Sequence, residues 1–243
     1  MDMQYMEQLK NLLGDAIAFD VPMCDYTSFK IGGKADCVLF AKNEEQLSTA
    51  LQFCAEHDLP YFVMGNGSNL LVSDRGMRQL VIMVRDGFEE IRVEGDKIIA
   101  GAGVKLARVA ETAAEHSLTG LEFAFGIPGR LGGALTMNAG AYGGEMVQVV
   151  KSVRIMERDG KIHDVPASDL DFGYRTSRIA NGRIALSCVM QLQEGDQAAI
   201  REKMATYQQA RRDKQPLQYP SAGSVFKRPV GYFAGALIEE ANL

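Results

Sequence analysis

Two side chains that lie near glycines in the sequence are candidates for chemistry: the guanidinium of Arg175 and the hydroxyl of Ser224. Arg175 lies in the run Gly173-Tyr174-Arg175-Thr176-Ser177. An arginine fork binds a carboxylate through two parallel hydrogen bonds, although a single arginine is more often only a surface charge. Ser224 lies beside Gly223 and has the cation Lys227 three residues later. Because there is no Gly-x-Ser-x-Gly elbow and no plausible His–Asp partner set, a hydrolase nucleophile is disfavoured.

The run Gly65-Asn66-Gly67-Ser68-Asn69-Leu70 is a candidate phosphate-binding turn. It fails as a dinucleotide fingerprint, because Leu70 stands where the third glycine belongs and no helix start follows. Successive amides of such a turn still form a nest for phosphate oxygens, and the alternative is a tight turn between strands. Gly32-Gly33-Lys34 is not a P-loop, since Ser28 occupies the position of the first glycine.

A longer glycine-rich stretch covers residues 126–145 and includes Gly126-Ile127-Pro128-Gly129 and Asn138-Ala139-Gly140-Ala141-Tyr142-Gly143. Neither helix nor strand propensity explains so many glycines. Small residues over this length let the backbone approach a large flat or charged ligand, and the alternative is an intertwined loop with left-handed positions.

Composition narrows the class of protein. The 243 residues include 26 Lys plus Arg and 31 Asp plus Glu, and a formal net charge of −5 without any Trp disfavours a nucleic-acid binder. No apolar run approaches the roughly 20 residues that span a bilayer, and the start lacks an apolar signal core, so we expect a cytoplasmic protein. The cysteines and histidines are scattered, which predicts reduced thiols and no metal site. The sequence leaves the oligomeric state open.

Periodicity predicts a mixture of helices and strands without regular β-α-β spacing, which favours an α+β fold. We expect helices over residues 3–13, 43–58, 104–116 and 196–212, strands over 61–64, 69–72, 80–84 and 183–193, and hairpins over 91–100 and 152–165.

Taken together, six segments resemble the UDP-N-acetylenolpyruvoylglucosamine reductase family. They are Tyr26-Thr27-Ser28-Phe29-Lys30-Ile31-Gly32-Gly33, Gly65-Asn66-Gly67-Ser68-Asn69, Gly126-Ile127-Pro128-Gly129, Met137-Asn138-Ala139-Gly140-Ala141-Tyr142-Gly143, Gly173-Tyr174-Arg175 and Gly223-Ser224-Val225-Phe226-Lys227. The short connection after Arg175 resembles the branch without the extra insertion in the substrate domain.

The resemblance implies a vanillyl-alcohol-oxidase-like (PCMH-type) FAD-binding domain over residues 1–195, in two α+β subdomains of about 1–85 and 86–195, followed by an incomplete α+β substrate-binding domain over 196–243. It implies NADPH-dependent reduction of UDP-N-acetylglucosamine enolpyruvate to UDP-N-acetylmuramate through FAD, in peptidoglycan biosynthesis. No nucleic acid or membrane partner is implied.

The resemblance also implies roles for individual residues. Arg175 and Ser224 match the catalytic arginine and the serine proton donor, and Tyr142, Lys214 and Lys227 are expected to bind substrate. FAD is expected to bind without a covalent link. The expected cofactor-binding residues are Gly65, Asn66, Gly67, Ser68, Asn69, Gly126, Ile127, Gly129, Gly133, Ala134, Asn138, Gly140 and Gly143.

Three departures from the family pattern stand out. Arg130 replaces the usual Ser or Thr after Gly-Ile-Pro-Gly, and Arg228 replaces the usual Asn after Phe-Lys. The sequence ends inside an expected helix over 233–242, before the family's C-terminal glutamate. We therefore expect either a truncated chain or a remainder that lies outside this sequence, and impaired activity for the chain as given. Two alternatives remain: another FAD-dependent oxidase or dehydrogenase of this fold, and a non-catalytic nucleotide-binding module.

Overall fold

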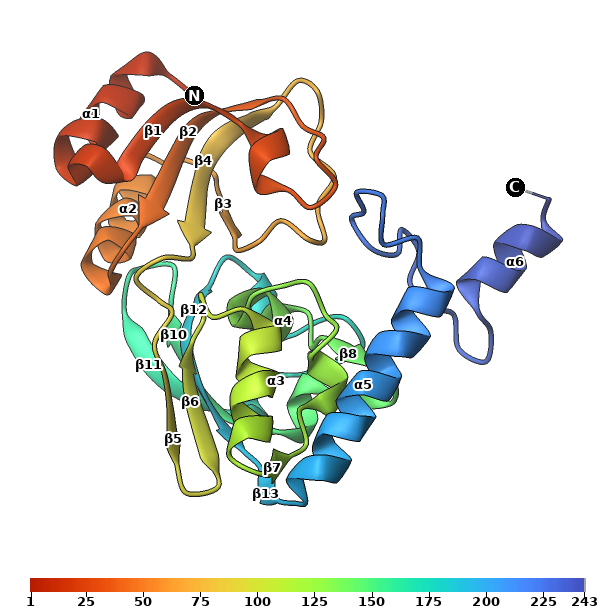
Figure 1. Ribbon diagram of the computed structural model, residues 1–243. Helices are drawn as coiled ribbons and strands as arrows, with labels where there is room; N and C mark the ends of the chain where they lie inside the picture. Colours follow the sequence, from red (N-terminus) through yellow and green to blue (C-terminus); the bar gives the residue numbers. More distant parts are fainter. Residues whose placement is uncertain (243) are drawn as a thin grey trace.

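The computed structural model describes residues 1–242, and its first half is built on a four-stranded sheet with the order β1-β2-β4-β3 (Figure 1). Its strands are β1 (Ile17–Pro22), β2 (Lys34–Ala41), β3 (Tyr61–Met64) and β4 (Met77–Val84). β1 is antiparallel to β2, whereas β2 and β3 are both parallel to β4. The carboxyl ends of β2, β3 and β4 therefore meet at one edge of the sheet.

Two helices cover this first sheet, α1 (Met3–Leu13) and α2 (Glu44–Glu56). α2 begins where expected, because the Asn43 side chain accepts a hydrogen bond from the Gln46 backbone N–H at 2.9 Å. Its apolar stripe, which includes Leu47 and Leu51, is buried in the core. The predicted helices over 3–13 and 43–58 are confirmed within one or two residues at each end.

A second, fully antiparallel sheet follows, with the order β11-β10-β12-β6-β5. Its strands are β5 (Ile91–Glu94), β6 (Lys97–Gly101), β10 (Val150–Met156), β11 (Ile162–Pro166) and β12 (Ile184–Gln191). Both predicted hairpins and the predicted long strand are confirmed. The helices α3 (Leu106–Glu115) and α4 (Leu131–Thr136) pack beside this sheet, together with the short strands β7 (Leu118–Thr119), β8 (Gly140–Ala141), β9 (Gly144–Glu145) and β13 (Gln193–Glu194).

One prediction from the sequence is wrong: residues 69–72 form no strand. The whole stretch between β3 and β4 is an irregular loop, although Val72 in it is buried. An apolar pattern this short does not distinguish a strand from a loop that packs one side chain into the core. The expected limits near residues 85 and 195 fall between β4 and β5 and between β13 and α5.

A single large apolar cluster joins the two sheets. It contains side chains from α1, α2 and β2 as well as from β6, β12 and α5. Burial of this continuous apolar surface is the main force that holds the two subdomains together.

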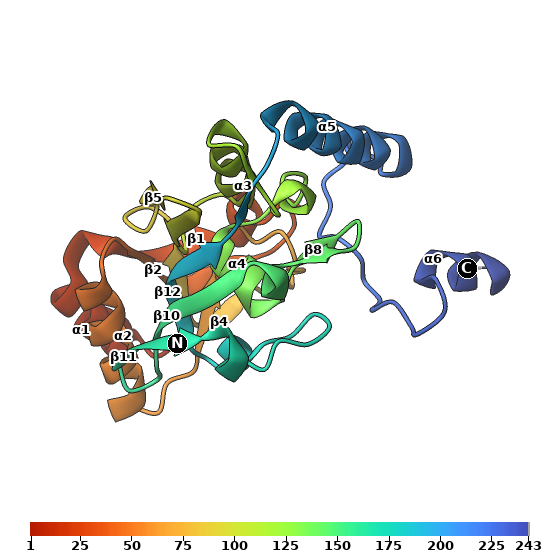
Figure 2. The ribbon, with the colours of Figure 1, turned by 90° about the horizontal axis from the view of Figure 1, so that it is seen from below.

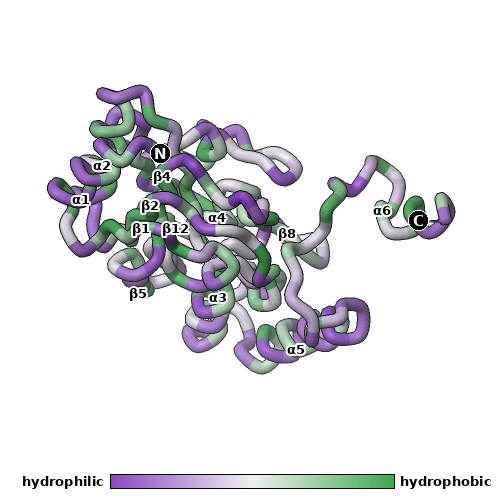
Figure 3. Tube along the Cα trace, turned by 90° about the horizontal axis from the view of Figure 1, so that it is seen from above, coloured by the Kyte–Doolittle hydropathy of each residue, from purple (hydrophilic) through white to green (hydrophobic). Residues whose placement is uncertain are grey.

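The C-terminal part leaves this body as the helix α5 (Gln197–Lys214), an extended tail and the short helix α6 (Ala234–Glu240). Figure 3 shows α5 largely in hydrophilic and pale colours, and only Ile200 and Met204 of its residues are buried. α6 lies apart from both sheets in two perpendicular views (Figures 1 and 2). Within residues 1–242 no helix is both long and apolar enough to cross a membrane.

Candidate active site

The 65–69 loop follows β3 at the edge where the parallel strands end. Gly67 has a φ of +59°, and a Cβ placed on it would lie 2.3 Å from the Tyr26 carbonyl oxygen. The Gly67 carbonyl accepts a hydrogen bond from the Ser28 backbone N–H at 3.3 Å. Only glycine fits this close approach of two backbones, so the 26–28 segment and the 65–69 loop form one unit.

The 126–130 turn joins this unit from the second subdomain. The Leu106 N–H donates to the Gly129 carbonyl at 2.9 Å, which holds the turn against the start of α3. A Cβ on Gly129 would lie 3.4 Å from Ser68 Oγ, and one on Gly65 would lie 3.4 Å from Arg130 Cβ. The two glycine segments that the sequence singles out are therefore in direct contact, although more than 50 residues separate them.

Asn138 organises the 138–145 hairpin behind this turn. Its side chain is buried and its φ is +40°. The amide Nδ2 donates to Glu145 Oε2 at 3.1 Å and to the Gly173 carbonyl at 3.2 Å, while Oδ1 accepts from the Val147 N–H at 3.0 Å. Since both donors are used within the protein, this side chain shapes the hairpin, and its assignment as a cofactor contact stays a prediction.

Arg175 reaches the same hairpin. Its Nη2 donates to the Gly140 carbonyl at 2.8 Å and its Nη1 donates to the Asn138 carbonyl at 3.3 Å. Its backbone adopts a φ of +57°, a strained conformation for a non-glycine residue that clusters at functional sites. Within residues 1–242 no carboxylate pairs with this guanidinium, so its positive charge stays uncompensated.

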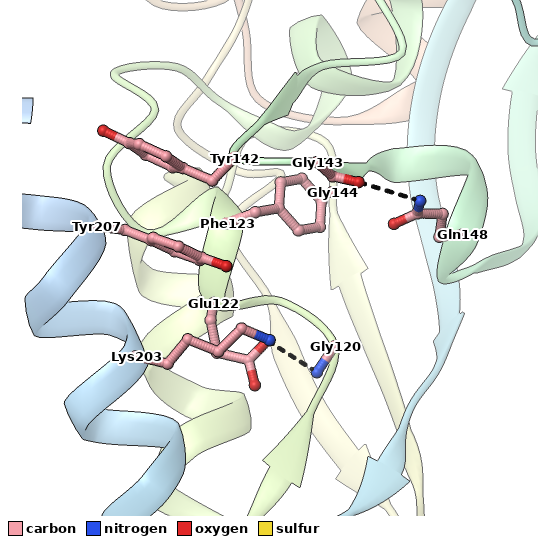
Figure 4. A pocket seen from close by; sticks show the side chains of 9 residues that line it. All are labelled: Gly120, Glu122, Phe123, Tyr142, Gly143, Gly144, Gln148, Lys203 and Tyr207. Carbon is pink, nitrogen blue, oxygen red and sulfur yellow. Dashed lines mark hydrogen bonds and ion pairs between the residues drawn. The ribbon is translucent and has the colours of Figure 1, made fainter. Parts of the chain in front are cut away.

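A cavity of about 230 Å³ lies between the 138–145 hairpin and α5 (Figure 4). Tyr142 stacks on Tyr207 of α5, with ring centroids 4.4 Å apart and planes 5° apart. Below them, buried Glu122 lies 3.6 Å from Lys203 Nζ. Burial raises the pKa of the Glu122 carboxyl, but hydrogen bonds from Thr119 and from backbone N–H groups, together with the charge of Lys203, outweigh this and leave the pKa below its usual value.

The tail passes the 65–69 loop before it turns away. Ser28 Oγ donates to the Ser221 carbonyl at 2.7 Å, and a Cβ on Gly223 would lie 3.8 Å from Asn69 Oδ1. The Arg228 N–H donates to the hydroxyl of Tyr174, next to Arg175, at 3.3 Å. Ser224 and Lys227 lie on this tail and are exposed, as is Lys214 at the end of α5.

The structure gathers many of the predicted site residues into two groups. In one, the 65–69 loop contacts the 126–130 turn and Gly223, and Ser28 holds Ser221; in the other, the 138–145 hairpin is joined to Arg175. Several residues near the site could not be found from the sequence, because each one contacts a residue from a distant segment of the chain. They are Arg85, Glu89, Tyr207 and the pair of Glu122 and Lys203. Within residues 1–242 no cluster of His, Cys, Asp and Glu is arranged to hold a metal ion.

The residues at this edge fit a dinucleotide cofactor. Gly65, Gly67 and Gly129 pack against Arg130, Tyr26 and Ser68, which joins these segments, and a Cβ on Gly133 would meet open space. Buried Arg85 Nε and Arg130 Nε have no hydrogen-bond partner within residues 1–242. Unpaired buried donors beside glycine backbone are suited to phosphate oxygens.

Comparisons with known proteins agree with this architecture. The family model described as FAD binding domain matches residues 35–166, and the one described as the C-terminal domain of UDP-N-acetylenolpyruvoylglucosamine reductase matches residues 215–243. A VAO-type flavoprotein from Myceliophthora thermophila has a TM-score of 0.59 at 13% identity, over 80% of this chain and 48% of its own. The chain is therefore an FAD-binding protein with the vanillyl-alcohol-oxidase-like α+β fold.

More similar proteins define the family. UDP-N-acetylenolpyruvoylglucosamine reductase of Alkaliphilus metalliredigens is 49% identical over 96% of this chain and 77% of its own length. The enzyme of that name from Streptococcus thermophilus is 46% identical over 100% of this chain and 80% of its own. The crystal structure of the reductase from Thermus caldophilus superposes with a TM-score of 0.81 at 36% identity, over 93% of this chain and 79% of its own. The chain belongs to the UDP-N-acetylenolpyruvoylglucosamine reductase family.

Proposed function

We propose that this chain catalyses NADPH-dependent reduction of UDP-N-acetylglucosamine enolpyruvate to UDP-N-acetylmuramate, a step of peptidoglycan synthesis. When bound, FAD would supply the hydride transfer from NADPH to the enolpyruvyl double bond, because no amino-acid side chain can donate a hydride. The 65–69 loop and the 126–130 turn would hold the cofactor. The observation that carries the proposal is the contact between these two glycine segments, together with the Arg175 guanidinium on the 138–145 hairpin, which no carboxylate pairs with among residues 1–242.

Arg175 has the role of an electrostatic stabiliser. Addition of hydride to an enol ether that bears a carboxylate builds negative charge on that carboxylate. A cation fixed in advance stabilises the transition state more than the ground state. Two backbone carbonyls, those of Asn138 and Gly140, hold the guanidinium of Arg175, so its orientation is set while its charge remains available to substrate.

Ser224 has the role of proton donor. The carbon next to the one that receives the hydride needs a proton, and a hydroxyl within hydrogen-bond reach supplies it. Serine is a weak acid, so a nearby cation must stabilise its alkoxide, and Lys227 and Lys214 are the candidates. Tyr142, Lys214 and Lys227 are proposed to bind the substrate.

Separating the two half-reactions tests these roles. We expect Ser224→Ala to leave the bleaching of flavin absorbance by NADPH unchanged and to slow substrate reduction by about 10²-fold or more, the usual contribution of a positioned proton donor. Ser221→Ala is a control for loss of a hydroxyl on the same tail: it removes only the hydrogen bond from the Gly223 N–H at 3.1 Å and keeps the carbonyl that accepts from Ser28. Equal loss in both half-reactions of Ser224→Ala would show that Ser224 is not the proton donor.

The alternatives give different results in the same assays. Another FAD-dependent oxidase or dehydrogenase would oxidise NADPH without regard to UDP-N-acetylglucosamine enolpyruvate. A non-catalytic nucleotide-binding module would not turn yellow on addition of FAD, or would bind it without reduction by NADPH.

A further inference from the structure

Buried polar atoms without a partner are rare in folded proteins, because each one costs the free energy of its lost hydration. Within residues 1–242 only three buried side-chain nitrogen or oxygen atoms lack a hydrogen-bond partner: Arg85 Nε, Thr112 Oγ1 and Arg130 Nε. Two of the three belong to arginines: Arg130, which lies against Gly65 of the 65–69 loop, and Arg85, which directly follows β4. An unpaired guanidinium donor at this position indicates an anionic ligand.

Arg130 is anchored at one end only. Its side chain is 4% exposed, and its Nη1 donates to Glu89 Oε1 at 2.5 Å and to the Gly103 carbonyl. Nε and Nη2, which form the other edge of the guanidinium, have no hydrogen-bond partner within residues 1–242. Two parallel N–H groups on one edge match the spacing of two phosphate oxygens.

The stem of Arg130 lies against the 65–69 loop. A Cβ on Gly65 would lie 3.4 Å from Arg130 Cβ and 3.7 Å from its Cδ. The stem of Arg130 therefore packs against Gly65 at the carboxyl end of β3, and the side chain is buried rather than in solvent.

Arg85 reaches the same edge from the neighbouring strand. It directly follows β4, which runs parallel to β3 with Met64 paired to Met83. Its guanidinium carbon lies 5.9 Å from the centroid of the Tyr26 ring, and the carbonyl of Tyr26 is the atom that Gly67 approaches. Tyr26 thus links Arg85 to the 65–69 loop, which Arg130 contacts at Gly65.

We propose that Arg130, with Arg85, binds the diphosphate of FAD, so that this chain uses a cationic pair where its family usually places a small hydroxyl. This inference rests on the proposed function only for the identity of the dinucleotide. Glu89 holds Arg130 through Nη1 and leaves the Nε–Nη2 edge for a phosphate. The Glu89 carboxylate orients Arg130, but its negative charge also repels the diphosphate.

The competing explanation is that Arg130 and Glu89 form only a structural ion pair. The two explanations predict different effects on FAD affinity when the charge of Glu89 is removed. If the pair is structural, loss of Glu89 leaves the Arg130 charge buried without a partner, and loss of Arg130 removes the anchor of the turn, so both variants bind FAD more weakly. If Arg130 is a phosphate ligand, neutralising Glu89 removes a repulsive charge and FAD binding is retained or strengthened.

The experiment is a titration of the flavin-free full chain with FAD, followed by flavin fluorescence at two salt concentrations. The variants are Arg130→Gln, Arg85→Gln and Glu89→Gln. The matched controls are Arg154→Gln and Glu44→Gln, which break an ion pair between the subdomains whose Nε–Oε1 distance is 3.1 Å and which lies away from the glycine segments. Thermal unfolding of each flavin-free variant checks that it folds.

We expect Arg130→Gln to raise the FAD dissociation constant by about 10-fold or more and to reduce its salt dependence, as for loss of a charged hydrogen bond. We expect a smaller rise for Arg85→Gln, no rise for Glu89→Gln, and no change in the controls. FAD binding by Arg130→Gln as tight as by the parent overturns the proposal, and so does equal weakening in Arg130→Gln and Glu89→Gln.

If Arg130→Gln does not fold, the other two variants decide: weaker FAD binding by Glu89→Gln, or unchanged binding by Arg85→Gln, overturns the proposal. A parent chain that binds no FAD contradicts the proposed function itself. A parent that binds FAD but does not reduce substrate contradicts only the reaction, and the comparison among the variants still holds.

Discussion

Two arginines in glycine-rich segments have opposite electrostatic surroundings. Arg130 is buried and pairs with the carboxylate of Glu89, whereas the partners of Arg175 within residues 1–242 are neutral, namely two backbone carbonyl groups and the Tyr174 ring. A guanidinium bound to carbonyl groups keeps its full charge for a ligand, while one that faces a carboxylate is partly neutralised. This difference explains why Arg175 suits stabilisation of charge that develops during a reaction, and why the proposed role of Arg130 is confined to binding.

Glu122 provides a pH-dependent contribution to stability. Its carboxylate accepts hydrogen bonds from the Thr119 hydroxyl at 2.5 Å and from the Gly120 N–H at 3.1 Å. Its pKa in the folded protein lies below the usual value of 4.5. A carboxyl whose pKa is lowered by folding stabilises the protein above its unfolded pKa and loses this effect as the pH falls through the folded pKa.

We therefore expect Glu122→Gln to lower the free energy of unfolding by about 1–2 kcal/mol at pH 7. The difference from the parent should shrink as the pH is lowered through the acid range, and urea unfolding at several pH values measures it. The matched control is Glu111→Gln on the exposed side of α3, 3.8 Å from Arg108, which should change stability by less than about 0.5 kcal/mol. A difference for Glu122→Gln that is independent of pH would contradict this account.

The loops at the carboxyl edge of the parallel strands depend on glycine for two separate reasons, and Gly67 combines them. It has a left-handed backbone with a φ of +59°, and it leaves no room for a Cβ beside the Tyr26 carbonyl. Gly95, in the hairpin between β5 and β6, has a similar φ of +61° but nothing within 4 Å of the Cβ position. A comparison of alanine substitutions at Gly67 and Gly95 therefore separates two contributions to the free energy of unfolding: the strain of a left-handed alanine and the steric clash of its Cβ.

Gly95→Ala should lower the free energy of unfolding by about 1 kcal/mol, the cost of a left-handed alanine, and leave FAD affinity unchanged. Gly67→Ala should be more destabilising and should weaken FAD binding by about 10-fold or more, because the loop must move away from the 26–28 segment. Chemical unfolding and FAD titration of the two variants test this. Equal FAD affinity in both would mean that the shape of the 65–69 loop does not matter for the cofactor.

The two sheets share one apolar core, which has a consequence for the cysteines. Cys37 and Cys54 lie in the first subdomain and Cys188 in the second, yet all three are buried in the same cluster. Burial raises the pKa of the Cys37 thiol to about 12 and that of the Cys54 thiol to about 11, and it also raises the pKa of the Cys188 thiol. The thiolate is the reactive form of cysteine. These three thiols are therefore protected from reagents in two ways: burial blocks access to them, and their raised pKa keeps them protonated.

In the native protein at pH 8 we expect a thiol reagent to label Cys24, which is partly exposed, and to leave the three buried cysteines unmodified. As urea is increased, Cys37, Cys54 and Cys188 should become reactive over the same concentration range, because one core unfolds as one unit. Mass spectrometry of labelled peptides measures each site. Labelling of Cys188 in a transition of its own would show that the subdomains unfold separately.

Local patterns in the sequence predicted most of the helices and the second sheet, but gave no expectation for β1, β2 or α4. Helical spacing with the Asn43 cap gave α2, and turn residues between apolar runs gave the two hairpins of the second sheet. The failure at residues 69–72 has a physical cause, because Val72 is buried by a loop and not by strand pairing. A glycine motif likewise indicates a close backbone approach without saying which backbone is approached.

The sequence by itself determined the family, the α+β class and the order of the motifs, since these depend on residue types and spacings along the chain. Only the tertiary structure decided that Gly129 faces Ser68, that Glu89 pairs with Arg130 from 41 residues away, and that the Asn138 amide is used within its own hairpin. Such contacts depend on how two sheets pack around a common core. Packing brings together residues that no local pattern relates, and it thereby sets which charges are neutralised and which remain available for a ligand.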